Sequence, residues 1–267
     1  RLDNKNTLIL DKEGNTLIEV SPKGRIVWRY HSEEENSLLN KPSGYSYLEE
    51  GNLLVADTDN HRVMEMDLDG NIVWQYGVKG APGIEYNSLN LPTDFQKTYD
   101  ETFLISDSGN NRIIELERKL NIETGAYELK VLWEYGNTDK VLNGGEGNGA
   151  NQLNKPISAF RELDGKTLIL DAGNKRIIQV DSRLDLLWEY GTESNDEVNN
   201  ISNPIRFTLL KNKDILIIGD GKLVEVFPEG NKVIWTTDME TLSSKSTFRV
   251  VKENVKKIKA KYGKDGY

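Results

Sequence analysis

The sequence predicts an all-β fold, a β-propeller built from four-stranded antiparallel blades. Three observations predict it: a repeat of fixed period, an aspartate and a tryptophan at constant spacing within each repeat, and turn residues between short apolar runs. The five repeats are TLILDKEGNTLIEVSPKGRIVWRY, LLVADTDNHRVMEMDLDGNIVWQYG, FLISDSGNNRIIELERKLNIETGAYELKVLWEYG, TLILDAGNKRIIQVDSRLDLLWEYG and LIIGDGKLVEVFPEGNKVIW.

The aspartate and the tryptophan measure each repeat. The pairs are Asp11 and Trp28, Asp57 and Trp74, Asp107 and Trp133, Asp171 and Trp188, and Asp220 and Trp235. The first, second and fourth pairs are 17 residues apart, whereas the third is 26 apart and the fifth 15. We therefore place nine extra residues in the third repeat, as a polar bulge around Arg118 to Lys130.

A proline precedes the aspartate in four repeats and marks the start of an inner strand, because proline fixes its own φ and has no amide to donate. The four prolines are Pro42, Pro92, Pro156 and Pro204. Turn-forming Asp, Asn and Gly residues then divide each repeat into four strands. In the second repeat the expected strands run from about Pro42 to Leu48, Leu53 to Asp57, Arg62 to Met66 and Ile72 to Tyr76.

The chain divides into one propeller domain, residues 1–251, and a basic tail, residues 252–267. The tail is expected to form an amphipathic helix, because Val251, Val255, Ile258 and Tyr262 fall at steps of four, three and four residues. Six lysines lie between Lys252 and Lys264. The helix is expected to pack on the propeller with its lysines in water; the alternative is contact with an acidic partner or a membrane surface.

The blade number depends on how the ring closes. The first repeat has only its second to fourth strands, and Ser246 to Val251 resembles an inner strand that would complete it. This favours five blades, and six blades are the alternative. Because RLDNKNTLILD at the start matches RELDGKTLILD of the fourth repeat, we expect further sequence upstream of Arg1.

The repeated residues have a structural interpretation. Large rings at the same place in each outer strand fill the wedge between blades, which predicts inter-blade core positions for Trp28, Trp74, Trp133, Trp188 and Trp235. An Asp-x-x-Asn-x-Arg motif recurs as a rigid hairpin lock in which the arginine pairs with the aspartate. Its members are Asp57, Asn60 and Arg62; Asp107, Asn110 and Arg112; and Asp171, Asn174 and Arg176.

At these residues the chain resembles two groups of propellers, the NHL-repeat proteins and the arylsulfotransferase-like proteins. DTDNHRVMEMDLDGNIVW is similar to an NHL repeat, and the recurrent Trp-x-Tyr ending is similar to the arylsulfotransferase side. The resemblance covers about Thr7 to Asp238. It implies a propeller fold, and it implies either an enzyme or an inert scaffold, because such repeats host both.

The resemblance also implies what an enzyme of these groups would need. A sulfotransferase of this type uses a channel histidine, and a lyase of the NHL group uses zinc held by histidines. This chain has His31 and His61 alone, neither on an expected inner strand, and no cysteine. The residues after the prolines are Ser43-Gly44, Thr93-Asp94, Ile157-Ser158 and Ile205-Arg206. We therefore expect no catalytic residue and no metal or other cofactor.

Composition limits the partners. The 34 Lys plus Arg against 43 Asp plus Glu give a net charge of −9, which disfavours nucleic acid. No apolar run approaches a membrane span. The long loops that enter the inner strands should lie on one face together with the motif turns. We predict an acidic interaction surface there, formed by Glu33, Glu34, Glu35, Glu193, Asp196 and Glu197, with calcium at Asp57 and Asp59 as a weaker alternative.

These observations favour a non-catalytic propeller that serves as a binding or assembly module. The expected partner is a protein, a glycan or a second copy of the chain, and the resemblance suggests the cell surface. The alternatives are an arylsulfotransferase-like or lyase-type enzyme that works in the central channel, and a structural subunit of a surface layer or filament.

Overall fold

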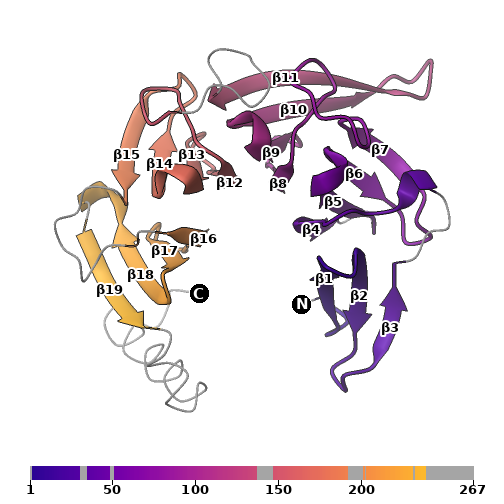
Figure 1. Cartoon of the computed structure of the whole chain (residues 1–267), viewed down its shortest axis with the longest axis horizontal. Helices are drawn as coiled ribbons and strands as arrows, with labels where there is room; N and C mark the ends of the chain where they lie inside the picture. The colour runs from indigo at the N-terminus through magenta and orange to yellow at the C-terminus, as the bar shows by residue number, and fades with distance from the viewer. Residues whose placement is uncertain are drawn as a thin grey trace.

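The structure is a computed structural model, and it describes residues 2–30, 35–48, 51–136, 147–191, 201, 203–230 and 232–238. These residues form five antiparallel sheets, which stand as blades around a common axis (Figure 1). The predicted five-bladed β-propeller is therefore confirmed. In the described residues the blades form an open arc, with blade 1 at one end and blade 5 at the other (Figure 1).

Each blade follows the order of the chain from the axis outward. Blade 1 has three strands, as expected, and blades 2 to 5 have four. The strands are β1 (Thr7–Asp11), β2 (Thr16–Val20) and β3 (Ile26–Arg29); β4 (Gly44–Tyr47), β5 (Leu53–Asp57), β6 (Arg62–Met66) and β7 (Ile72–Tyr76); β8 (Pro92–Lys97), β9 (Phe103–Asp107), β10 (Arg112–Leu120) and β11 (Tyr127–Gly136); β12 (Pro156–Arg161), β13 (Thr167–Asp171), β14 (Arg176–Val180) and β15 (Leu186–Tyr190); and β16 (Pro204–Leu209), β17 (Ile215–Gly219), β18 (Lys222–Phe227) and β19 (Lys232–Asp238).

Short 3-10 helices complete the described elements: η1 (Glu35–Ser37), η2 (Thr58–Asn60), η3 (Ser108–Asn110), η4 (Ala172–Asn174) and η5 (Pro228–Gly230). None of the helices in the described ranges has the length and apolar character needed to cross a bilayer. The predicted closing strand at Ser246 to Val251 and the basic tail lie outside the described residues.

Two strand predictions differ from the structure. The inner strand of the second repeat begins at Gly44 rather than at Pro42, although the amide of Ser43 already donates to the carbonyl of Ala56 at 3.0 Å. The nine extra residues of the third repeat do not form a bulge at Arg118 to Lys130. They lengthen β10 and β11 into a long hairpin, because the residues there continue to pair in register beyond the shift at Glu115.

Among the described residues the core is divided into four clusters of buried apolar side chains, each between two successive blades. We call the side of a blade that faces the preceding blade its leading face, and the opposite side its trailing face. In blades 2, 3 and 4 the second strand is buried along its whole length. A middle blade therefore hides both faces, and its second strand is apolar at nearly every position.

The repeated tryptophans lie on the trailing faces. Trp28, Trp74, Trp133 and Trp188 each belong to a cluster between two blades, and Trp74 is only 6% exposed. Trp235 is half-buried on blade 5. The rings therefore fill the wedge that opens between blades with distance from the axis.

The Asp-x-x-Asn-x-Arg motif forms a buried ion pair in three blades. The Nε of Arg62 lies 2.8 Å from Asp57, and the corresponding distances are 2.7 Å for Arg112 with Asp107 and for Arg176 with Asp171. Burial raises the pKa of Asp107 to about 6, against the opposing charge of Arg112. The pairing joins the ends of the second and third strands.

We predict that replacing Arg112 by methionine lowers the free energy of unfolding by about 3–5 kcal/mol, because it leaves the Asp107 carboxylate buried without its counter-charge. Urea denaturation at neutral pH measures the change. Arg183→Met is the control, since Arg183 is 84% exposed and its Nε lies 3.7 Å from Asp181. This control should cost less than about 1 kcal/mol. Equal effects of the two substitutions would contradict a structural role for the buried pair.

Candidate functional site

The inner strands place four residues in one layer around the axis. The second residue after each proline pairs with the last but one residue of the next strand. The pairs are Gly44 with Ala56, Asp94 with Ser106, Ser158 with Leu170, and Arg206 with Ile218. Because the register is the same in the four blades, these residues share one level. We call Gly44, Asp94, Ser158 and Arg206 the axial layer.

Asp94 is the acidic residue of the axial layer. Its Oδ2 accepts a hydrogen bond from Ser158 Oγ at 2.6 Å, and its Oδ1 accepts one from the amide of Phe95 at 2.9 Å. A Cβ atom at Gly44 would lie 3.4 Å from Asp94 Oδ1. The carboxyl of Asp94 therefore lies between β4 and β12, against the backbone of one and the hydroxyl of the other.

Burial raises the pKa of Asp94 above its ordinary value. The hydrogen bonds from Ser158 and Phe95 and the charge of Arg206 act in the opposite direction. A carboxyl whose pKa is raised exchanges its proton closer to neutral pH, and this property suits a general acid or base. Asp94 is thus the described residue of the axial layer best able to move a proton.

The residues directly after the prolines bulge from the strands and link the blades. The register shifts at this position in β8, β12 and β16. Ser43 Oγ donates to the carbonyl of Thr93 at 2.6 Å, and Thr93 Oγ1 donates to the carbonyl of Ile157 at 3.0 Å. These bonds hold the inner strands of blades 2, 3 and 4 together and fix the axial layer.

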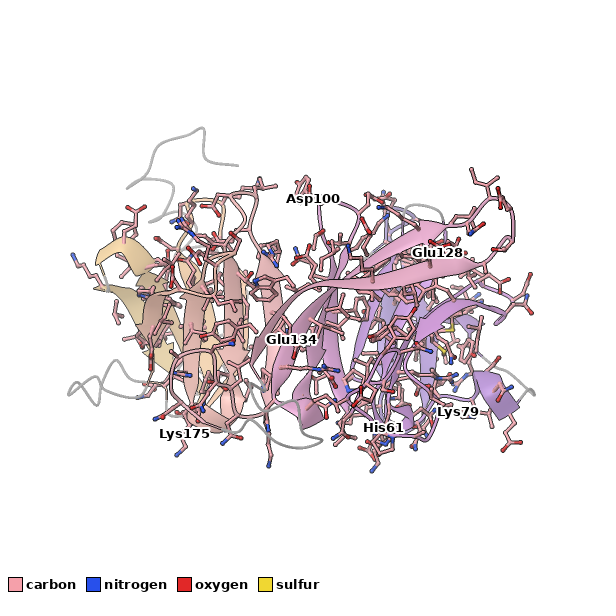
Figure 2. The ribbon with its side chains drawn as sticks, turned by 90° about the horizontal axis from the view of Figure 1, so that it is seen from above. His61, Lys79, Asp100, Glu128, Glu134 and Lys175 are labelled. Carbon is pink, nitrogen blue, oxygen red and sulfur yellow. The ribbon has the colours of Figure 1, made fainter. Side chains whose placement is uncertain are left out.

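The sequence motif also organises the loop face, the edge of the propeller that carries the 3-10 turns. Figure 2 shows His61, Lys79 and Lys175 along this edge and Asp100 and Glu128 along the opposite one. The Oδ1 of each motif aspartate accepts the amide of a loop residue 17 positions earlier, at 2.7 Å; these residues are Asn40, Asn90 and Asn154. Each motif aspartate therefore binds the incoming loop in addition to the arginine of its own hairpin.

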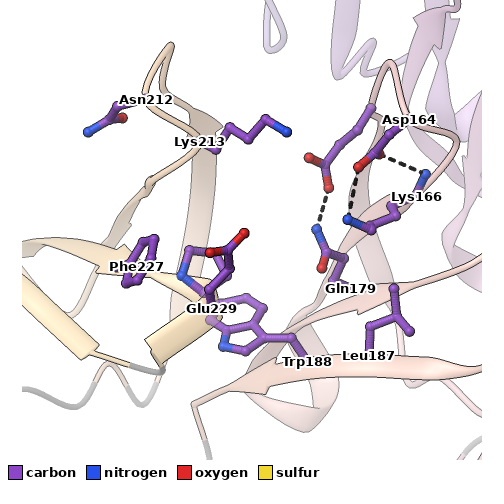
Figure 3. Close-up of a pocket in the computed structure, with 11 residues that line it drawn as sticks. Asp164, Lys166, Gln179, Leu187, Trp188, Asn212, Lys213, Phe227 and Glu229 are labelled. Carbon is purple, nitrogen blue, oxygen red and sulfur yellow. Dashed lines mark hydrogen bonds and ion pairs between the residues drawn. The ribbon is translucent and has the colours of Figure 1, made fainter.

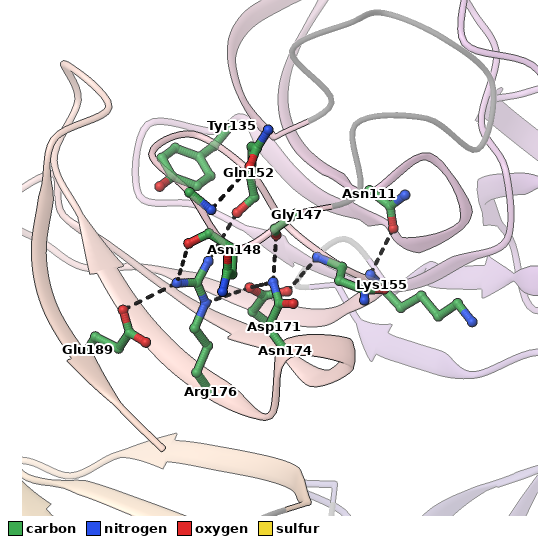
Figure 4. Close-up of polar contacts among 12 residues, drawn as sticks. Asn111, Tyr135, Gly147, Asn148, Gln152, Lys155, Asp171, Asn174, Arg176 and Glu189 are labelled. Atoms are coloured by element: carbon green, nitrogen blue, oxygen red, sulfur yellow. Dashed lines mark hydrogen bonds and ion pairs between the residues drawn. The ribbon is translucent and has the colours of Figure 1, made fainter. Parts of the chain in front are cut away.

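The asparagine and arginine of the motif grip the same loop. In blade 4, Asn174 donates to the carbonyl of Gly147 at 2.7 Å, and Arg176 donates to the carbonyls of Asn148 and Gln152 at 3.1 Å (Figure 4). In blade 3 the loop approaches so closely that a Cβ atom at Gly109 would lie 2.7 Å from the carbonyl oxygen of Asn90. The motif is a loop clamp as well as a hairpin lock.

His61 belongs to this loop face and links two blades. It adopts the left-handed conformation at the end of η2, and its Nδ1 accepts the amide of Leu91 at 3.1 Å. Asn15 and Asn111 accept the amides of Lys41 and Lys155 in the same way. Burial lowers the pKa of His61, against the charge of Asp59. The neutral imidazole is therefore a hydrogen-bond acceptor between blades.

The predicted acidic surface is described at one residue. Glu35 is exposed in η1, and its carbonyl oxygen accepts the ammonium of Lys79. Glu33, Glu34, Glu193, Asp196 and Glu197 lie outside the described residues, as does His31.

The alternative calcium site uses two carboxylates that have protein partners. Asp57 accepts bonds from Asn40, Asn60 and Arg62, and Asp59 lies 3.1 Å from the Nζ of Lys41. Within the described ranges, no group of three His, Cys, Asp or Glu side chains is arranged to hold a metal ion.

From the sequence we considered Asp94 and its neighbours only because they include no histidine. A sign of its importance was present in the sequence. Two residues follow each of the four prolines, and among these eight residues Asp94 is the one with a carboxylate. What the sequence lacked was the register that places Ser158 and Arg206 at the same level.

No protein-family model matches the chain, and no curated protein matches it. Solved structures do. A streptogramin B lyase structure matches with a TM-score of 0.57 and 12% identity, over 89% of this chain and 66% of that one. Virginiamycin B lyase from Staphylococcus aureus matches with a TM-score of 0.57 and 12% identity, over 89% and 67%. A protein of unknown function from Bacteroides caccae matches with a TM-score of 0.56 and 15% identity, over 88% and 78%.

These comparisons show the β-propeller fold. The chain spans about two thirds of the length of the lyases that it matches. The similarity to the NHL-repeat and arylsulfotransferase-like groups stays a prediction.

We predict that His61→Asn keeps the stability of the protein at pH 7.5 to within about 0.5 kcal/mol, because asparagine tolerates the left-handed conformation and accepts the same bond. His61→Leu should cost about 1 kcal/mol. Because the folded-state pKa of His61 is lowered, the unfolded chain binds the proton more readily, and stability falls as the pH drops below about 6.5. Urea midpoints at pH 7.5 and 5.5 should show a smaller fall in His61→Asn. Identical pH profiles of the two proteins would contradict the acceptor role.

Proposed function

We propose that the chain is a non-catalytic binding and assembly module whose two end blades bind the end blades of a second copy. One observation carries this proposal. The leading face of blade 1 and the trailing face of blade 5 have the apolar residues that every interface between blades buries, yet no cluster of buried residues joins these two faces in the described part of the chain.

The leading face of blade 1 matches that of blade 2. Ile9 pairs with Ile18 in blade 1, as Val55 pairs with Met64 in blade 2. Val55 and Met64 are fully buried against blade 1. Ile9, by contrast, is 42% exposed, and Ile26 on the same face is 52% exposed. Blade 1 thus presents an apolar face of the kind that a preceding blade covers.

The trailing face of blade 5 has the apolar residues that the trailing faces of the other blades bury against the next blade. Its residues are Leu216, Ile218, Leu223 and Trp235, and all four are half-buried. They correspond in register to Leu168, Leu170, Ile177 and Trp188 of blade 4, of which the first three are fully buried against blade 5.

The two end faces are complementary. In each of the four described interfaces, a trailing face like that of blade 5 packs on a leading face like that of blade 1. Blade 5 of one copy therefore fits blade 1 of another, which is a head-to-tail contact that builds a closed ring or a filament. We favour contact between faces over strand addition at β1, because the hydroxyl of Tyr45 already donates to the carbonyl of Leu8 there at 2.6 Å.

Sedimentation over a wide range of protein concentrations tests the assembly. We expect the protein to associate as its concentration rises, and the double substitution Ile9→Asp and Ile26→Asp to keep it monomeric, because carboxylates resist burial in an apolar contact. Ile122→Asp is the matched control, since Ile122 is 92% exposed beyond the end of β10. This variant should associate like the wild type.

Two results would overturn the proposal. One is a wild-type chain that stays monomeric at every concentration and remains so after residues 239–267 are removed. The other is a chain that associates only after this removal, which would make those residues the occupant of the end faces.

A second candidate function is catalysis in the central channel. The buried carboxyl of Asp94, with Ser158 and Arg206 at the same level, favours it, and the fold is similar to that of the streptogramin B and virginiamycin B lyases. In this hypothesis Asp94 exchanges a proton with the substrate, Ser158 orients the carboxyl and Arg206 attracts an anionic group.

Asp94→Asn tests this candidate with two readouts. Since burial raises the folded-state pKa of Asp94, the folded protein binds this proton more tightly than the unfolded chain, so stability falls as the pH rises from about 4 through the raised pKa. The substitution should flatten this fall and stabilise the protein at neutral pH. It should also abolish any turnover of quinupristin, the compound present in a crystal structure of a catalytically inactive virginiamycin B lyase from Staphylococcus aureus. A wild-type chain without turnover excludes the lyase hypothesis.

A further inference from the structure

Two neighbouring interfaces of the propeller hold an arginine of the chain itself against the outer-strand tryptophan. Between blades 2 and 3, the guanidinium carbon of Arg118 lies 5.1 Å from the ring centre of Trp74, and Nη1 lies 2.5 Å from Glu65. Between blades 3 and 4, the guanidinium carbon of Arg161 lies 4.7 Å from the ring centre of Trp133, and Arg161 Nη2 lies 2.7 Å from Glu115.

The site around Arg161 has a defined set of walls. Glu115 pairs with Trp133 across β10 and β11. The guanidinium lies between them and the turn that follows β12, where Nη1 donates to the carbonyl of Gly165 at 3.0 Å. Three components therefore hold the guanidinium: an indole face, a carboxylate and the turn of the next blade.

The interface between blades 4 and 5 has residues at the corresponding positions, but it lacks this arginine and has a glutamine in place of Glu115. Gln179 pairs with Trp188 as Glu115 pairs with Trp133, and Lys213 occupies the turn position of Gly165. Leu209 stands in place of Arg161, because it pairs with Ile215 as Arg161 pairs with Thr167. Leucine has no guanidinium to supply, so the position that Arg161 fills in one interface is not filled from this strand in the next.

A cavity of about 430 Å³ lies at this interface, and Gln179, Trp188 and Lys213 line it. Figure 3 shows Lys213 and Glu229 of blade 5 on one side and Asp164, Lys166 and Gln179 of blade 4 on the other. The volume exceeds that of a guanidinium and its methylene stem, and it lies within the range of small-molecule sites.

The charges that line the cavity suit a cation with a planar head. Glu162, Asp164 and Glu229 provide three carboxylates, against the two ammonium groups of Lys166 and Lys213. Asp164 is paired with Lys166 at 2.8 Å. Glu162 accepts a bond from Gln179, which places its carboxylate beside the residue that replaces Glu115. The carboxylate of the Arg161 site thus has a counterpart that comes from the β12–β13 turn instead of from the third strand.

We propose that the cavity between blades 4 and 5 binds the guanidinium group of an external arginine, stacked on Trp188 and paired with Glu162 and Glu229. The inference is independent of the assembly through the end blades, because the cavity lies at an interface inside the propeller. The arginine belongs to a peptide or is free arginine, whose carboxylate would meet Lys213.

Titration of the full chain with N-acetyl-L-arginine methylamide tests the proposal, followed by the indole N–H signals in a nitrogen-15 correlation spectrum. Trp188→Phe assigns the signal of Trp188. We expect this signal to shift with a dissociation constant on the order of 1–10 mM, as for one cation–π contact with an ion pair. N-acetyl-L-citrulline methylamide has the same shape without the charge and should bind at least about tenfold more weakly. A parallel titration with free L-arginine separates the two sources, since the tighter ligand identifies the natural one.

Two substitutions in the protein complete the test. Leu209→Arg supplies the internal arginine that the interface lacks, so it should weaken binding by about tenfold or more. Ile122→Arg is the matched control, since Ile122 is 92% exposed beyond the end of β10 in blade 3, and it should leave binding unchanged. Glu229→Gln, at an exposed position, should weaken binding by about threefold or more without a change in fold. The proposal is overturned if the Trp188 signal does not shift at saturating arginine ligand, or if the citrulline compound shifts it equally.

Discussion

The propeller depends on one constraint: a blade is stable only when both of its faces are covered. The four described interfaces satisfy it in the same way: a trailing face with its tryptophan packs on the apolar leading face of the next blade. The first and last blades have the same pattern of apolar residues on their outward faces, so the same constraint applies to these two faces. In the described part of the chain, the end faces of blades 1 and 5 are those that no cluster of buried residues joins to another blade, and this is why the function we propose is located there.

The motif residues and the turns beside them link a blade to its loop and to the next blade. In blades 2, 3 and 4 the Asp–Arg pair holds the hairpin and also binds the incoming loop, so these loops are fixed to the blades that they precede. At the equivalent turn of blades 1, 2 and 3, a residue in the left-handed conformation accepts an amide of the loop that enters the following blade; these residues are Asn15, His61 and Asn111. The chain thus repeats a set of interactions rather than a set of residues. His61, of the residue type that suggests catalysis in the sequence, acts as an acceptor of a backbone amide.

The sequence predicted the fold well because the features that specify it are local and repeated. The Asp-to-Trp spacing gave the blades, and Asp, Asn and Gly turns gave β5, β6 and β7 at their observed bounds. It predicted the site poorly, because the site depends on contacts between repeats. Asp94 meets Ser158 across 64 residues, and Arg118 reaches Glu65 across 53. The long β10–β11 hairpin was misjudged for the same reason. Its polar residues suggested an irregular insertion, whereas the guanidinium of Arg118 lies over the rings of Trp74, Phe103 and Tyr127.

Native-state hydrogen exchange, resolved by strand, tests the central claim most directly, because protection reports how well each blade is covered. The account predicts the slowest exchange in β5, β9 and β13, whose blades are covered on both sides, and faster exchange in β2 and β18 of the end blades at low protein concentration. Protection of β2 and β18 should then rise as the concentration increases. Uniform protection across the five blades that does not change with concentration would contradict it.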